Sequence, residues 1–330
     1  VFAIGYPLLT QGSYVKINDA IYRSYTPTDA SGSGVFDPFL RISDANDTLV
    51  QGYNTDWKNT ADGKHEFPQA QDSKTTEYLL SSVPIVTDPD YPGVYREFQL
   101  DINQTSTQDI SLDEVEIYLT LLPNLEGYNA IDFGGQAAKI YELDDGTDNW
   151  IQLNYDLASG SGKRDMILRV PDARFRDVAG YPYCEYTASS CSTYVVLYSR
   201  FGGDDGGQWF NNDGFEEWGT EIYELATKSG YKFNDLNHNG AKDSGEPGLE
   251  GWTIYVDINS NGQFDLGEPS DDTDSTGFYQ INNIVPNPDE TSMWKVREVG
   301  QSGWYCSLPA DQDNFGCYYE ENFAPGEIKT

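Results

Sequence analysis

The sequence predicts an all-β protein of two domains, a large N-terminal β-sandwich over residues 1–228 and a smaller sandwich over residues 229–330. Short runs of β-branched and aromatic residues recur between turns rich in Gly, Asp, Asn and Pro, which is the pattern of antiparallel sandwiches. No segment keeps a helical period, and residues 221–228 would form at most a turn or two of helix. A chain of 330 residues is long enough for two domains with separate cores.

The strands expected in the first domain are short apolar runs. They are Tyr14–Ile17, Phe39–Ile42, Val94–Ile102, Val115–Leu121, Trp150–Leu153, Met166–Val170 and Tyr194–Tyr198. A short Ser229-Gly230 junction is expected to lead into the second domain, because small and turn-forming residues separate compact units.

Two loops of the second domain share one spacing of oxygen-bearing side chains, at loop positions 1, 3, 5, 9 and 12, with Gly at position 6. The side chains are Asp235, Asn237, Asn239, Asp243 and Glu246 in the first loop and Asp257, Asn259, Asn261, Asp265 and Glu268 in the second, and Ala241 and Gln263 stand at position 7. This is the EF-hand loop pattern, in which the position-7 carbonyl adds a ligand and the last Glu binds Ca²⁺ through both oxygens. The sequence therefore predicts one Ca²⁺ in each loop; the alternative is a pair of Asn/Asp/Gly turns that bind nothing.

The flanks of these loops predict strands instead of the helices of an EF-hand. Pro247, Gly248 and Gly251 follow the first loop, and a helix starts poorly at such residues. Apolar and polar residues then alternate along 252–258 with the period of a half-buried strand.

Residues 229–320 resemble the calcium-binding B repeats of Gram-positive surface adhesins, the SdrD B-like modules related to the collagen-adhesin B-type sandwich. The resemblance is carried by Tyr231–Gly240, Gly245–Trp252, the second loop through Gly267-Glu268-Pro269, Thr273–Gly277 and Trp294–Val299. It implies a small Ig-like sandwich stiffened by calcium, with Asp274 as a further ligand. The stretches Tyr95–Asn103 and Asn212–Trp218 resemble parts of bacterial secreted proteins that carry a C-terminal sorting tail.

The charge of the chain indicates which classes of partner it can bind. With 54 acidic and 20 basic residues, the formal net charge is -34, so nucleic acid and anionic membrane surfaces would be repelled while divalent cations would be attracted. Aromatic residues make up 14% of the chain, which supplies the apolar area that disordered acidic segments lack.

The four cysteines form two pairs that are close in sequence, Cys184 with Cys191 and Cys306 with Cys317. Local disulfides are expected; metal ligation competes poorly, because there is no Cys-x-x-Cys spacing and the only histidines, His65 and His238, are far from both pairs in sequence. Disulfides indicate an oxidising compartment, where millimolar calcium would suit loops of this kind. Asn46-Asp-Thr and Asn103-Gln-Thr are glycosylation triplets. The chain has no basic leader and no apolar run that could enter a membrane, so a mature extracellular form is expected.

Nothing in the sequence indicates an enzyme. The histidines stand near no nucleophile motif, and acidic pairs such as Asp113-Glu114 and Glu216-Glu217 are common in so acidic a chain. The acidic stretch 201–218 is either a further calcium loop or, as we favour, a crowded turn. The alternative function is carbohydrate binding or adhesion to polysaccharide, through aromatic residues in loop-like sequence: Tyr181, Tyr183, Tyr186, Trp209 and Phe210. Those rings could equally fill the core.

A covalent crosslink is a further hypothesis for the second domain. Glu298 shares a strand face with Trp294 and Val296, and an unpaired buried carboxylate is costly. By the resemblance, this Glu would stand beside a Lys–Asn isopeptide bond between Lys232 and Asn322. The competing interpretation is an ion pair of Glu298 with a basic side chain, since B repeats generally lack that bond.

The ends of the chain suggest assembly of identical copies into a filament. Val1–Leu9 has seven apolar residues in nine and must be buried, either as the first strand of its own sandwich or as a strand donated to another copy. Pro325-Gly326 interrupts the strand with which such modules close, which would leave an edge open to a donated strand. We therefore expect an extracellular structural protein of a prokaryotic cell surface or filament, with Ca²⁺ and copies of itself as partners.

Overall fold

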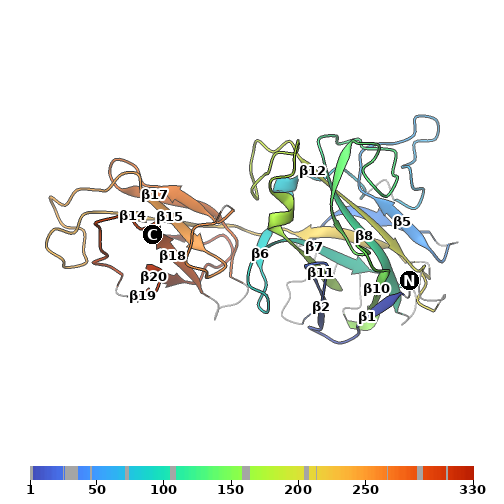
Figure 1. The fold of residues 1–330 in the computed structure, drawn as a ribbon, viewed down its shortest axis with the longest axis horizontal. Coiled ribbons are helices and arrows are strands. Elements are labelled where there is room, and N and C mark those ends of the chain that lie inside the picture. The colour runs from blue at the N-terminus through green and yellow to red at the C-terminus, as the bar shows by residue number, and fades with distance from the viewer. Residues whose placement is uncertain are drawn as a thin grey trace. The chain divides into compact units, whose positions relative to one another are not determined.

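A computed structural model describes residues 3–24, 26, 36–44, 47–70, 74–104, 109–157, 164–203, 208–212, 214–265, 267–287, 293–309 and 311–330. It is 41% strand and 3% helix, which confirms the all-β sandwich class. The chain divides into two compact units, Val1–Ile85 with Tyr95–Ile222, and Val86–Val94 with Tyr223–Thr330. We call them the N-terminal and C-terminal units and describe each by itself (Figure 1).

The N-terminal unit contains two sheets. The first has the order β1-β10-β8-β12-β5, with β9 also on β8, and the second has the order β2-β3-β11-β7-β13-β4, with β6 on β7. The strands of the first sheet are β1 (Ile4–Leu8), β5 (Val50–Tyr53), β8 (Ile110–Thr120), β9 (Ala137–Glu142), β10 (Asn149–Leu153) and β12 (Tyr194–Phe201). Those of the second are β2 (Tyr14–Ile17), β3 (Ala20–Ser24), β4 (Phe36–Ile42), β6 (Ile85–Thr87), β7 (Val94–Ile102), β11 (Met166–Pro171) and β13 (Glu216–Glu221). Single 3-10 turns lie at η1 (Leu80–Ser82), η2 (Tyr155–Leu157) and η3 (Asp172–Phe175).

The core of this unit lies between the two sheets. Ile117 of β8 and Leu197 of β12 belong to the same buried cluster as Phe98 of β7 and Trp218 of β13. The indole Nε1 of Trp218 donates a hydrogen bond of 2.9 Å to Ser199 Oγ on β12, so a polar contact also links the sheets. Apolar burial is thus the main stabilising contribution here, at about 1.5 to 3 kcal/mol for each large side chain.

A buried ion pair connects β7 of the N-terminal unit to two 3-10 turns. The Nε of Arg96 lies 2.8 Å from Asp172 Oδ1, and both side chains are buried. The Nη1 of Arg96 donates to the carbonyls of Leu80 and Val83 at 2.9 and 2.8 Å. This arginine therefore joins β7 to two 3-10 turns and has its charge balanced inside the protein.

The C-terminal unit also contains two sheets, with orders β17-β14-β21 and β16-β15-β18-β20-β19. The strands are β14 (Ala226–Tyr231), β15 (Thr253–Asp257), β16 (Ser270–Asp272), β17 (Phe278–Ile284), β18 (Trp294–Glu298), β19 (Gln312–Asp313), β20 (Gly316–Glu321) and β21 (Ile328–Lys329). Ile254, Val256, Ile281, Val296 and Phe323 are among its buried apolar residues. The alternation expected along 252–258 is only partly correct, because Tyr255 and Asp257 are buried as well.

Two sequence expectations are wrong in detail. The proposed helical turns at 221–228 do not exist, because Glu221 ends β13 and Ala226 begins β14. The expected domain boundary at 228/229 falls inside β14, where Ser229 and Gly230 pair with Gln280 and Tyr279 of β17. The chain passes into the C-terminal unit after Ile222 instead, and it also passes between the units at 85/86 and 94/95. The small residues that suggested a junction allow close packing within a strand.

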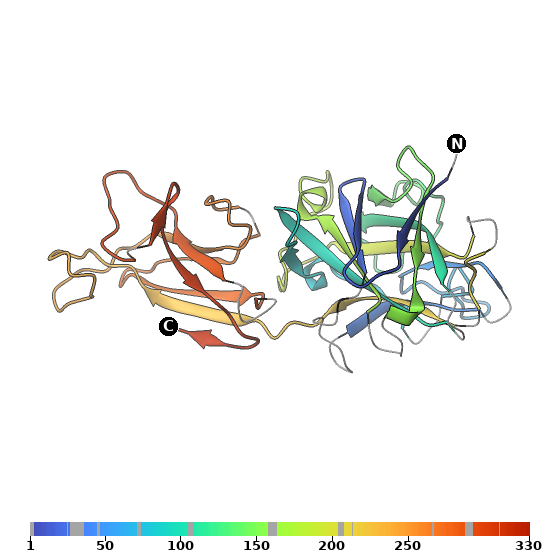
Figure 2. The ribbon, with the colours of Figure 1, turned by 90° about the horizontal axis from the view of Figure 1, so that it is seen from below.

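The apolar N-terminal segment forms a strand of its own unit. Residues 4–8 are β1, which pairs in parallel with β10 from Ile4↔Asn149 to Leu8↔Leu153. This strand, dark blue in Figure 2, lies at the edge of its sheet. Residues 1 and 2 lie outside the described part of the chain.

Candidate metal sites

Both predicted calcium loops connect strands, as their flanks indicated. The first, Asp235–Glu246, follows β14 and leads to β15, and the second, Asp257–Glu268, begins at the last residue of β15 and leads to β16. Residue 266 of the second loop is outside the described residues. The first loop therefore precedes β15 and the second follows it.

The backbones of the two loops turn at the same positions. Positive φ angles occur at position 4 (His238, 60°; Ser260, 55°), position 6 (Gly240, 74°; Gly262, 75°) and position 11 (Gly245, 97°; Gly267, 96°). Residues other than glycine rarely adopt this left-handed region. Agreement at three such positions shows that the shared spacing produces one shared loop conformation.

The hydrogen bonds of the loops also correspond position by position. At position 9, Asp243 Oδ2 accepts from the amide groups of Asn237 (2.8 Å) and Asn239 (2.7 Å). In the second loop Asp265 Oδ2 accepts in the same way from Asn259 (2.8 Å) and Asn261 (2.6 Å). Three predicted ligand side chains thus converge on one point in each loop.

The first and last positions close each loop around that point. Asp235 accepts from the main-chain N–H groups of Asn239 (3.2 Å) and Gly240 (2.9 Å), and Asp257 accepts from those of Asn261 and Gly262 at 3.1 Å each. At position 12, Glu246 accepts from Leu236 and Asp243 (both 2.9 Å), and Glu268 accepts from Ile258 (3.1 Å) and Asp265 (3.0 Å). One oxygen of each glutamate thus bonds position 2 and the other bonds position 9, so both oxygens face into the loop, as a bidentate ligand at position 12 requires.

The asparagines determine what the loops can bind. Their amide nitrogens point at the position-9 carboxylate, and rotation of an amide by 180° exchanges its nitrogen for its oxygen. The rotated arrangement would crowd oxygens together and is stable only when a cation lies among them. Carboxylate, amide and carbonyl oxygens are the ligands preferred by Ca²⁺ and not by thiolate-seeking metals.

Among the described residues, no three His, Cys, Asp or Glu side chains form a group that could hold a metal. In each loop the carboxylates at positions 1 and 12 accept from main-chain N–H groups and the carboxylate at position 9 accepts from side-chain amides, so the three are not directed to one another. An ion would have to draw these carboxylates inward together with the amides. Calcium binding therefore remains a prediction of the ligand pattern.

The second loop is the more buried of the two. Asp257 is fully buried, and its Oδ2 lies 2.7 Å from Nε of the buried Arg297, which also pairs with Asp313. Burial, together with the charges of Asp257 and Asp265, raises the pKa of Glu268 to about 8. The ligands of this loop are thus crowded and poorly solvated without a cation.

Asp274, implied as a further ligand by the family resemblance, belongs to a separate turn. Its Oδ1 accepts from the main-chain N–H groups of Thr276 (2.8 Å) and Phe278 (3.0 Å) and from the Thr276 hydroxyl (2.7 Å). Through these bonds Asp274 stabilises the turn between β16 and β17.

The residues of the isopeptide hypothesis are placed as follows. Lys232 Nζ lies 2.5 Å from Glu298 Oε2 and 4.4 Å from the centre of the Trp252 ring. Asn322 contributes its main-chain oxygen to Lys329 Nζ. Glu298 therefore meets a basic side chain, the competing interpretation, and the covalent bond stays a hypothesis.

Both local disulfides are confirmed, with Cα–Cα distances of 5.5 Å for Cys184–Cys191 and 6.5 Å for Cys306–Cys317. Because disulfides persist in oxidising compartments, they indicate a protein that acts outside the cytoplasm. None of the helices in the described residues has the length and apolar character needed to cross a bilayer.

The aromatic residues considered for sugar binding are half-buried. Tyr181 and Tyr183 pack against the N-terminal core, and the Tyr183 hydroxyl donates to both oxygens of Asp172 at 3.1 Å. Tyr186, Trp209 and Phe210 are also only partly exposed. Asn46 of the first glycosylation triplet, Thr105 of the second, and residues 204–207 and 213 of the acidic stretch lie outside the described residues.

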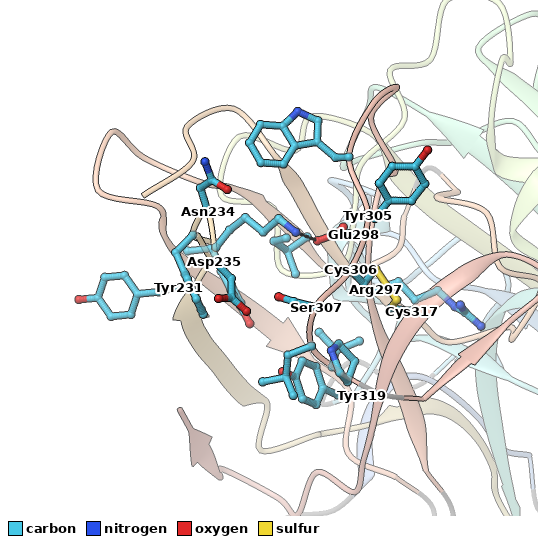
Figure 3. A pocket seen from close by; sticks show the side chains of 18 of the residues that line it. Tyr231, Asn234, Asp235, Arg297, Glu298, Tyr305, Cys306, Ser307, Cys317 and Tyr319 are labelled. Carbon is cyan, nitrogen blue, oxygen red and sulfur yellow. Dashed lines mark ion pairs between the residues drawn. A yellow bond between two sulfur atoms is a disulfide. The ribbon is translucent and has the colours of Figure 1, made fainter. Parts of the chain in front are cut away.

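Sequence reasoning missed a cavity of about 370 Å³ in the C-terminal unit. Figure 3 shows Tyr231 and Asp235 on one side of it and Tyr305, Cys306 and Cys317 on the other. The run Gly303-Trp-Tyr-Cys-Ser-Leu308, unusually aromatic for a loop, was the signal that could have indicated it.

No protein-family model and no curated protein sequence matches this chain. We therefore infer its function from the loops, the disulfides and the surfaces of the molecule itself.

Proposed function

We propose that this protein is an extracellular structural component of a prokaryotic cell surface or filament, in which two calcium ions stiffen the C-terminal unit. The observation that carries the proposal is the repeated loop geometry, with the same three side chains converging in both loops. A pair of unrelated turns would have no reason to share every hydrogen bond.

The stabilisation expected from calcium is modest for each site and useful for the pair. Extracellular calcium modules bind with Kd values of about 10⁻⁴ to 10⁻³ M. At a free calcium concentration ten times the Kd, each site adds about 1.4 kcal/mol to the free energy of unfolding. Because the two loops frame β15, both ions would stabilise the same strand.

The other properties of the chain agree with this role. Its charge of -34 suits a calcium-rich exterior and keeps the protein away from anionic surfaces. Two disulfides support an extracellular location. Copies of the chain would assemble head to tail. The alternative, a carbohydrate-binding or adhesin protein, has less support because Tyr181 and Tyr183 pack inward.

Thermal unfolding in calcium and in excess EDTA tests the calcium role. We expect chelation to lower the midpoint of the C-terminal unit by roughly 10–20 °C, since the two sites together add about 2.8 kcal/mol and 1 kcal/mol corresponds to about 4–8 °C for a domain of this size. Glu246→Gln and Glu268→Gln should each remove about half of the calcium-dependent shift. Glu250→Gln, an exposed glutamate outside both loops, is the matched control and should keep the full shift. An identical melting curve with and without EDTA would contradict the proposed calcium binding.

A further inference from the structure

The sandwich of the C-terminal unit is open along one side. Strand β21 pairs with β14 only at Thr227 and Lys228, and β19 pairs with β20 only at Gly316 and Cys317. Among the described residues, no strand continues past these short pairings. The rest of the β14 edge and the end of β20 therefore face a gap between the two sheets.

The backbone beyond this point presents free hydrogen-bonding positions to the gap. Lys232 is bonded on the other side, through its N–H to Gly277 (2.7 Å) and its carbonyl to Leu249 (3.0 Å). Because successive residues of an extended chain face opposite sides, Tyr231 and Phe233 direct their N–H and C=O groups to the open edge. Unpaired edges of this kind pair readily with another extended segment.

The cavity described above lies along this edge (Figure 3). Its floor is formed by Ile254, Tyr279 and Val296 from the inner faces of both sheets, and Tyr319 of β20 and the loop 303–309 form its far wall. We call the cavity and its edge the open groove. A volume of about 370 Å³ is large enough for two or three apolar side chains.

Apolar side chains are exposed around the open groove to a degree that a monomer seldom tolerates. Tyr305 is 94% exposed, Tyr231 54%, Leu308 48% and Trp304 42%, and all four line the cavity. Contiguous exposed apolar surface of this kind marks an interaction site. The groove therefore lacks a covering segment.

We propose that the open groove binds strand β1 of a second copy of this chain, which adds to the β14 edge in line with β21. Ile4, Tyr6 and Leu8 stand on one face of β1, with Gly5 and Pro7 on the other. Such a strand can place bulky apolar side chains into the cavity while its small residues face outward. The inference rests on the proposed structural role and specifies the contact through which copies of the chain would associate.

In its own unit β1 is held weakly. It is an edge strand in parallel pairing, a slightly less stable arrangement, and only Leu8 of its five residues is buried. Ile4 remains 44% exposed. Transfer to the groove would bury Ile4 and would replace part of the main-chain pairing with β10 by hydrogen bonds to Tyr231 and Phe233.

Charge distinguishes this donor from other segments. Copies that each carry -34 repel one another over most of their surfaces. The first 18 residues contain no Asp or Glu, and neither does the loop 299–309 beside the groove. These two surfaces can meet without like-charge repulsion.

The contact joins different surfaces of identical chains, so it propagates into a filament unless the rotation closes a ring. Two full-length variants test it by sedimentation across a concentration series. Ile4→Asp disables the donor, and Leu308→Asp disables the acceptor. Ile131→Asp is the control, because Ile131 is an exposed apolar residue of the N-terminal unit outside the groove.

We expect the wild type and Ile131→Asp to form concentration-dependent oligomers and each of the other variants to associate at least tenfold more weakly with itself. An equal mixture of Ile4→Asp and Leu308→Asp should form heterodimers, because one copy keeps the donor and the other keeps the groove. Heterodimer formation also shows that both variants are folded.

Two results would contradict the binding of β1 in the open groove without contradicting the structural role. In the first, both variants assemble like the wild type; in the second, their mixture stays monomeric while the wild type assembles. If both variants assemble and Leu308→Asp loses retention on insoluble polysaccharide, the groove binds sugar instead. A wild type that remains monomeric at every concentration in calcium contradicts head-to-tail assembly itself.

Discussion

The two units share one architecture and differ in what holds it together. The N-terminal unit packs Phe98, Ile117 and Trp218 between two broad sheets and balances its buried charge internally, as Arg96 does with Asp172. The C-terminal unit has smaller sheets, an open groove and two acidic loops whose ligands converge around β15. The N-terminal unit encloses its core without further partners, and we propose that calcium ions and a neighbouring chain complete the C-terminal unit.

The difference follows from size. A small domain buries a smaller fraction of its surface, so its apolar core alone supplies little net stability. In the C-terminal unit long loops replace strand length, and the proposed calcium ions would offset the mutual repulsion of the loop carboxylates. Dependence on calcium is thus expected of one unit and not of the other.

The largest expected effect is in the N-terminal unit. Arg96→Met leaves the buried Asp172 with Arg176 as its remaining cationic partner and should lower the free energy of unfolding by about 3 kcal/mol. The same change at Arg200, whose pair with Glu114 is partly exposed, should cost less than about 1 kcal/mol. Urea unfolding measures both, and a loss no larger for Arg96→Met than for Arg200→Met would show that internal charge balance does not sustain this unit.

A smaller effect concerns the pH dependence of stability in the N-terminal unit. Burial, and secondarily the nearby Asp101, raises the pKa of Glu216 to about 8 from the ordinary 4.5. Between these values the folded state holds a proton that the unfolded state has lost, so stability falls as pH rises, by roughly 2–3 kcal/mol from pH 6 to pH 8. Glu216→Gln should flatten this dependence in urea unfolding, in calcium and in EDTA alike. An unchanged slope in the variant would assign the pH dependence to other groups.

What the sequence predicts well is local. The spacing of Asp235 to Glu246 determines the loop conformation, and a sequence separation of only seven between Cys184 and Cys191 suffices to suggest their bond. The pairing of Asp257 with Arg297 could not be read from the sequence, because 40 residues separate them and their contact depends on the register of β15 with β18. The open groove depends on which edges remain unpaired after both sheets form, and no local pattern contains that information.

The misplaced boundary at Ser229-Gly230 has a similar cause. Small residues mark turns in general, yet Gly230 is needed where the Tyr279 ring lies against β14, and a Cβ at residue 230 would approach the Tyr279 hydroxyl to 2.5 Å. Tertiary packing overrides the local preference at this position.

Hydrogen exchange of main-chain amides, followed in calcium and in EDTA, tests the contrast between the units most directly. The account predicts that the amides of 236–246 and 258–268 and of strand β15 are protected in calcium and exchange at least tenfold faster in EDTA. Strands β7, β8 and β12 of the N-terminal unit should exchange at the same rate in both conditions. Equal exchange in the two loops with and without calcium, or equal acceleration in both units, would contradict the account.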